Sequence, residues 1–307
     1  MKSDYVAPEG SGAAMHGLIR DLYPVCRSIT GKGFRDSLRR LSELVPISLT
    51  EVPTGTAVFD WTVPREWNIS DAWIADSSGR RVVDFRNCNL HVVSYSIPVR
   101  ARMSLVALRP HLHTLPEKPD VIPYRTSYYT EDWGFCLSDR TLQEMPDGEY
   151  EVCIDSTLAP GHLTYGECIL PGATTDEILI SVHSCHPSLA NDNLSGMAVG
   201  AFLARHLANK QLKHTFRFLF IPGTIGSITW LAGHEAEARR IRHGLVLSCL
   251  GDRGPSTYKR SRRGTALVDR AAAHVLRLAG AHTLLDFVPY GYDDRQYCSP
   301  GFNLPVG

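Results

Sequence analysis

The feature that most constrains the fold is a short apolar run followed directly by a cluster of polar side chains. The run at residues 178–182 predicts a strand that is buried on both faces. The small, apolar stretch at 197–206 predicts a helix that packs against the same sheet. A loop between such a strand and such a helix lies at the carboxyl end of the strand, where open α/β sheets bind their ligands.

This loop contains two histidines and an aspartate within ten positions, namely His183, His186 and Asp192. Imidazole nitrogens and carboxylate oxygens are ligands that zinc takes in proteins, so the three residues are candidate metal ligands. The alternative is that the histidines are solvated or hydrogen-bonded and that residues 191–193 form an ordinary Asn-Asp-Asn turn. The preceding strand and the following helix favour a metal site, but the residues alone leave both interpretations open.

Composition argues against nucleic-acid binding, membrane association and a disulfide-rich secreted protein. The 307 residues carry 32 Lys+Arg and 32 Asp+Glu, so the formal net charge is zero and no electrostatic argument favours nucleic acid or a membrane surface. The eight cysteines contain no Cys-x-x-Cys pair, which favours reduced thiols and a cytoplasmic protein. The amino terminus lacks the apolar core of a signal peptide, and no apolar stretch approaches the length of a membrane span.

The pattern of elements changes twice along the chain. Helical spacing of apolar residues at 15–23 and 34–44 is followed by short alternating strands over 47–110. Strand and helix patterns then alternate, which favours an α/β sheet with helices on both faces. We therefore expect a discontinuous α/β domain, 1–46 and 111–307, with an inserted β subdomain that shapes a pocket or mediates a homo-oligomer.

Two later turns supply further candidates. The turn after the next predicted strand holds Gly223 and Thr224 and contains no carboxylate. After the third strand, Cys249 or Asp252 could reach a metal shared with the first loop. The simpler interpretation is that Cys249 is a core thiol and that Asp252 belongs to a surface turn.

Two more segments could contact a substrate. In the basic run 258–263, Arg260 and Arg262 could grip a substrate carboxylate or phosphate, although a solvated basic loop is the simpler interpretation. The aromatic and polar segment 290–300 could line a pocket but has no metal-binding spacing.

The chain resembles a known family over nearly its whole length. The stretch 182–196, Val-His-Ser-Cys-His-Pro-Ser-Leu-Ala-Asn-Asp-Asn-Leu-Ser-Gly, is similar to the aminopeptidase-like domain proteins of the DUF4910 and DUF2172 families, which are related to the M28 zinc aminopeptidases. Residues 58–69, 89–93, 128–129 and 133–136 resemble the inserted β domain of the same family. The resemblance implies an M28-like zinc-peptidase sheet.

The resemblance also implies site residues. His183 matches the first histidine ligand of the M28 enzymes, and Asp192 matches their bridging aspartate. Cys185 stands where those enzymes have an aspartate that orients the histidine. His186 is an addition and a rival ligand to His183.

Other M28 positions are changed in this chain. Gly223 and Thr224 stand where the M28 enzymes place a Glu-Glu pair, the general base and a zinc ligand. The next aspartate ligand falls near Cys249 or Asp252. The final histidine would come after Gly307, so the resemblance predicts that the C-terminal part of the domain is missing.

The sequence therefore predicts a zinc-dependent, aminopeptidase-like hydrolase that acts on a small peptide or amide. One zinc ion would be held by His183 or His186, by Asp192 and by Asp252. His186 or Asp293 could replace the missing base, and no catalytic residue is assigned.

Two alternatives remain. The first is a non-catalytic binding protein on the same scaffold, which the missing Glu-Glu pair favours. The second is a gene fragment without function.

Overall fold

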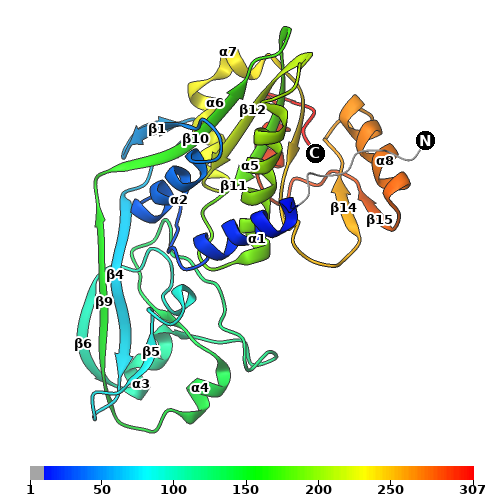
Figure 1. The fold of residues 1–307 in the computed structure, drawn as a ribbon. Coiled ribbons are helices and arrows are strands. Elements are labelled where there is room, and N and C mark those ends of the chain that lie inside the picture. The colour runs from blue at the N-terminus through cyan, green and yellow to red at the C-terminus, as the bar shows by residue number, and fades with distance from the viewer. Residues whose placement is uncertain (1–9) are drawn as a thin grey trace.

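A five-stranded mixed sheet organises the larger part of the chain (Figure 1), and the computed structural model describes residues 10–307. The strands lie in the order β1 (Ser48–Pro53), β10 (His162–Leu170), β12 (His214–Ile221), β11 (Thr174–His183) and β13 (Ile241–Val246). β11 pairs in parallel with β12 and β13, whereas β1 with β10 and β10 with β12 are antiparallel pairs. This arrangement confirms the predicted α/β class.

A second sheet is smaller and entirely antiparallel. Its strands lie in the order β5 (Arg81–Asp84), β4 (Glu66–Ala75), β9 (Glu149–Ala159) and β6 (Val99–Ser104). Figure 1 shows the long strands β4 and β9 leading from the large sheet into this smaller layer.

Helices and short strands complete the described part of the chain. The helices are α1 (Ser11–Leu22), α2 (Lys32–Ser42), α3 (Leu105–Leu108), α4 (Asp139–Glu144), α5 (Gly196–Leu207), α6 (Ile225–Gly233), α7 (Glu235–Ala238), α8 (Leu267–Ala279), α9 (Asp294–Tyr297), and the single turns η1 (Asn89–His91), η2 (Arg109–His111) and η3 (Ala190–Ser195). The other strands are β2 (Ala57–Val58), β3 (Trp61–Thr62), β7 (Leu112–His113), β8 (Phe135–Cys136), β14 (Ser256–Lys259) and β15 (His282–Leu285). None of the helices in residues 10–307 has both the length and the apolar character that a membrane span requires.

Helices cover both faces of the large sheet. Val182 and Phe220 are paired positions on one face, where α5 lies so close that a β-carbon on Gly200 would be 3.0 Å from Val182 Cγ2. The opposite face carries Ser181, whose hydroxyl lies 2.9 Å from the Tyr297 hydroxyl of α9. Both faces of β11 are therefore buried, as its apolar run predicts.

Strand pairing crosses the predicted limits of the β subdomain, 47–110. β1 falls inside those limits but pairs with β10 in the large sheet, and β9 falls outside them but pairs with β4 and β6. The reason is physical: an alternating pattern shows that a segment is a strand, but its partner is chosen by contacts that are distant in the sequence. By pairing, the smaller sheet spans residues 66–159.

A buried ion network fixes the large sheet against α6. Arg217 of β12 donates to both carboxylate oxygens of Glu177, at 2.6 and 3.0 Å, and also to Glu167 of β10. Trp230 of α6 donates to the same Glu167 oxygen at 3.0 Å. Arg217 is only 5% exposed, so removing it leaves two carboxylates in a poorly hydrated space.

We expect Arg217→Ala to lower the free energy of unfolding by about 3–5 kcal/mol, because breaking a buried pair leaves its partners uncompensated. The matched control is Arg242→Ala, which removes a mostly exposed pair with Asp176 and should cost less than about 1 kcal/mol. Urea unfolding followed by tryptophan fluorescence measures both values. Equal costs for the two variants would contradict the role given to the network.

Candidate metal site

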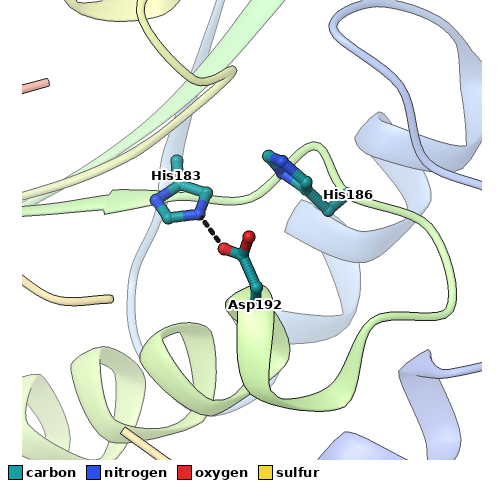
Figure 2. A group of neighbouring side chains, drawn as sticks. All are labelled: His183, His186 and Asp192. Carbon is teal, nitrogen blue, oxygen red and sulfur yellow. Dashed lines mark hydrogen bonds and ion pairs between the residues drawn. The ribbon is translucent and has the colours of Figure 1, made fainter. Parts of the chain in front are cut away.

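Three side chains with metal-binding atoms converge where the parallel strands of the large sheet end. His183 is the last residue of β11, His186 lies in the loop that follows, and Asp192 lies in η3 just before α5. One ligand atom from each lies within 4.8 Å of the others. In Figure 2 the carboxylate of Asp192 points between the two imidazole rings, and its Oδ1 lies 2.7 Å from His183 Nε2.

Asn193 fixes the backbone around this cluster. Its side-chain NH2 donates to the carbonyl of His183 at 3.0 Å and to that of Leu247 at 2.9 Å. Its side-chain oxygen accepts from the backbone N–H groups of Gly196 at 3.3 Å and Cys249 at 3.2 Å. One buried amide thereby joins the end of β11, the loop after β13 and the start of α5. The adjoining peptide bond, Asp192–Asn193, is cis.

A glycine is required next to this amide. A β-carbon on Gly196 would lie 2.5 Å from Asn193 Oδ1, which is closer than non-bonded atoms approach. The hydroxyl of Ser195 accepts from the backbone N–H of Leu250 at 2.9 Å and donates to the carbonyl of Asn191 at 2.6 Å. The Asn-Asp-Asn-Leu-Ser-Gly stretch thus builds the turn that presents Asp192.

A buried arginine holds the loop that carries His186. Arg27 has no exposed surface and donates to the His186 carbonyl from Nε at 3.1 Å and from Nη2 at 2.8 Å. It also donates to the carbonyl of Leu22, the last residue of α1, at 2.6 Å. Burial lowers the pKa of Arg27 to about 10, so it stays charged at neutral pH. Sequence reasoning missed Arg27, because no motif distinguishes it.

Tyr292 is the second residue that sequence reasoning missed. It comes from the segment between β15 and α9, and its ring stacks on that of His183 with centroids 4.0 Å apart. Its hydroxyl lies 3.0 Å from His186 Nε2 and 3.3 Å from Asp192 Oδ2. Burial, followed by the charge of Asp192, raises the pKa of Tyr292, so the hydroxyl is protonated at neutral pH. The only sequence signal was the aromatic, polar composition of 290–300.

The turn after β12 contributes no carboxylate to the site. A β-carbon on Gly223 would point toward Tyr292 Cε1 at 3.4 Å, Cys185 Sγ at 3.6 Å and His183 Cβ at 3.6 Å. The backbone N–H of Gly223 donates to Cys185 Sγ at 3.2 Å. Burial raises the pKa of the Cys185 thiol to about 12, so it is a protonated, unreactive thiol at neutral pH.

Asp293, one of the two candidate bases, is fully buried beside the start of α6. Its Oδ1 accepts from the backbone N–H of Thr224 at 2.9 Å and from the hydroxyl of Ser227 at 2.7 Å. Burial raises the pKa of this carboxyl group. The observed hydrogen bonds give Asp293 the role of anchoring the segment that carries Tyr292.

The other predicted site residues lie outside the cluster. Asp252 is exposed and accepts from Asn191 at 3.2 Å, and in residues 10–307 the group of ligand atoms within 4.8 Å does not include it. Arg260 pairs with Asp286 at 2.6 Å, and Arg262 is exposed. Substrate binding by these two arginines stays a prediction.

The charges around the cluster suit metal binding. Burial, together with the nearby His183, lowers the pKa of His186 to about 4. Burial alone would raise the pKa of Asp192, but the hydrogen bond from His183 and the neighbouring imidazole of His186 outweigh it and lower the pKa. At neutral pH the cluster therefore presents a neutral His186 imidazole and an ionised Asp192 carboxylate, the forms in which these groups bind a metal.

We expect His186 in the metal-free protein to titrate with a midpoint of about 4, against an ordinary value of 6.5. The His186 imidazole has a higher pKa in the unfolded chain than in the folded protein, so the unfolded chain binds the proton at a higher pH. Protonation of His186 therefore lowers the free energy of unfolding as the pH falls from about 6.5 towards 4. NMR titration of the imidazole signals measures the midpoint, and the signal that disappears in His186→Gln gives the assignment. A midpoint near 6.5 for that signal would contradict the burial described here.

Comparison with known proteins identifies close and distant relatives. The chain matches the family model described as "Domain of unknown function (DUF4910)" over residues 16–307. A protein of Clostridium acetobutylicum named "Putative polysaccharide biosynthesis protein with aminopeptidase-like domain" is 49% identical over 298 residues, which are 97% of this chain and 69% of that protein. The crystal structure of a "putative peptidase" from the same organism is 48% identical with a TM-score of 0.96, covering 97% of this chain and 72% of the other.

A distant relative shows the fold alone. The zinc aminopeptidase of Bacillus subtilis has a TM-score of 0.65 at 12% identity, covering 97% of this chain and 84% of the other. The predicted M28-like peptidase fold is therefore confirmed. Because the family model spans nearly the whole chain and a relative is almost half identical, the chain belongs to the DUF4910 family of aminopeptidase-like domains.

Proposed function

We propose that this chain is a metal-dependent hydrolase that binds one zinc ion and cleaves an amide bond in a small peptide-like substrate. The observation that carries the proposal is the convergence of His183, His186 and Asp192 at the end of β11. Two imidazole nitrogens and one carboxylate oxygen form a donor set that zinc takes at catalytic sites, with a fourth position left over. Bound there, zinc would act as a Lewis acid and lower the pKa of a bound water.

The protein's own residues prepare the site before any metal binds. Hydrogen bonds from the buried side chains of Arg27 and Asn193 fix the backbone positions of His186 and His183. Asp192 is about a third exposed, so the cluster can be reached from solvent on the side of this carboxylate. Such preorganisation lowers the cost of gathering the ligands around one ion.

The relatives support the choice of substrate class. The Clostridium acetobutylicum protein is named for an aminopeptidase-like domain, and a zinc aminopeptidase shares the fold. An amide bond in a small peptide or a related compound is therefore the substrate that we propose.

A second candidate function is ligand binding without hydrolysis. Amide hydrolysis needs a group that moves protons, and Gly223 and Thr224 supply no carboxylate. Asp293 is buried and already accepts two hydrogen bonds. Both observations favour a protein that binds a ligand on a hydrolase scaffold without cleaving it. Failure to turn over any amide substrate would support this second function.

We expect purified protein to hold about one zinc ion per chain and Asp192→Ala to lose it, because a three-ligand site loses a charged ligand. The loss in affinity should exceed the roughly 10–100-fold that removal of an outer-shell partner costs. Elemental analysis after dialysis measures zinc content, and a panel of aminoacyl amides measures hydrolysis.

Asp252→Ala is the matched control, since Asp252 is an exposed aspartate outside the cluster. It should keep its zinc. Equal loss of zinc from both aspartate variants would contradict the three-residue ligand set, and full zinc retention by Asp192→Ala would contradict the site itself. Zinc binding without turnover of any amide would favour the binding protein.

A further inference from the structure

Tyr292 is held in place by contacts on both sides along the chain. Asp293, the next residue, is fixed to the start of α6 through Thr224 and Ser227. The ammonium group of Lys259 donates to the backbone carbonyl of Tyr290 at 3.0 Å and lies 2.6 Å from Asp294. The position of the Tyr292 ring is therefore set by anchors outside the cluster.

Gly223 lies beside this ring and has no side chain to compete with it for space. A β-carbon at Gly223 would lie 3.4 Å from Tyr292 Cε1, so a longer side chain would enter the volume that the tyrosine ring occupies. The ring stacks on His183 with an interplanar angle of 8°. Tyr292 thus fills a place beside the cluster that the turn after β12 leaves open.

The hydroxyl of Tyr292 lies within hydrogen-bonding distance of two of the three candidate ligands, close to the spacing of ligand atoms around one metal ion. Its oxygen is 3.0 Å from His186 Nε2 and 3.3 Å from Asp192 Oδ2. Neighbouring ligand atoms around a tetrahedral zinc ion, with bonds of about 2.0–2.1 Å, are about 3.3–3.4 Å apart. The four side chains together offer two nitrogens and two oxygens.

We propose that Tyr292 is the fourth protein ligand of the metal and binds it through the phenolate oxygen. This inference rests on the metal site of the proposed function. On binding, the Tyr292 O–H bond is exchanged for an oxygen–metal bond and the proton passes to solvent. Four protein ligands close a site, so a water or substrate that reaches the metal must displace Tyr292 or add as a fifth ligand.

The test compares wild-type protein with Tyr292→Phe, which keeps the ring and its stacking on His183 but removes the oxygen. The matched control is Tyr290→Phe, because Tyr290 belongs to the same segment and its side chain is 84% exposed. Zinc affinity is measured by competition with a chromophoric chelator, and visible absorption is measured on protein loaded with Cu2+, an ion that suits nitrogen and oxygen ligands.

We expect zinc affinity to fall about tenfold or more in Tyr292→Phe and to stay unchanged in Tyr290→Phe. Wild type and Tyr290→Phe loaded with Cu2+ should show a visible phenolate-to-copper charge-transfer band that Tyr292→Phe lacks. A tyrosine that only hydrogen-bonds to ligands could change affinity but would give no such band.

The outcomes separate the two proposals. One outcome is that Asp192→Ala loses the metal but copper-loaded wild type shows no charge-transfer band. This result overturns the ligand role of Tyr292 and leaves the metal site standing. Wild type that binds neither zinc nor copper overturns both. Circular dichroism of Tyr292→Phe verifies that the variant is folded before either result is read.

Discussion

The buried amide of Asn193 is the interaction on which the candidate site depends. Its two donors and its oxygen reach three separate parts of the chain, the end of β11, the loop after β13 and the start of α5. Because the Asn193 side chain is buried, shifting any one of these segments would leave polar groups of this amide without partners, which is costly. Asp192, the adjacent residue, is held against His183 as a consequence.

Helices on both faces of the sheet support the place where Asn193 joins β11, α5 and the loop after β13. On one face the small residues of α5 allow close packing, as the 3.0 Å approach of Gly200 to Val182 shows. On the other, the Arg217 network fixes α6, whose first turn binds Asp293 and thereby places Tyr292. The contacts that hold α6 on the sheet therefore belong to the same framework as the contacts that place Tyr292.

Sequence predicted the parts of this structure that are local. The buried strand, the polar loop and the following helix lie within about thirty residues, so periodicity and ligand chemistry could point to His183, His186 and Asp192. Arg27 and Tyr292 reach the same site from positions 159 and 106 residues away from His186, and nothing in their local sequence shows that contact. The sheet to which β1 and β9 belong is likewise set by partners that are distant in the sequence.

The central claim is that His183, His186 and Asp192 form one metal centre. X-ray data collected on crystals of zinc-loaded protein, above and below the zinc absorption edge, test this claim most directly. The account predicts one anomalous peak within bonding distance of all three side chains. A peak on other residues, or none at this cluster in crystals that contain zinc, would contradict it.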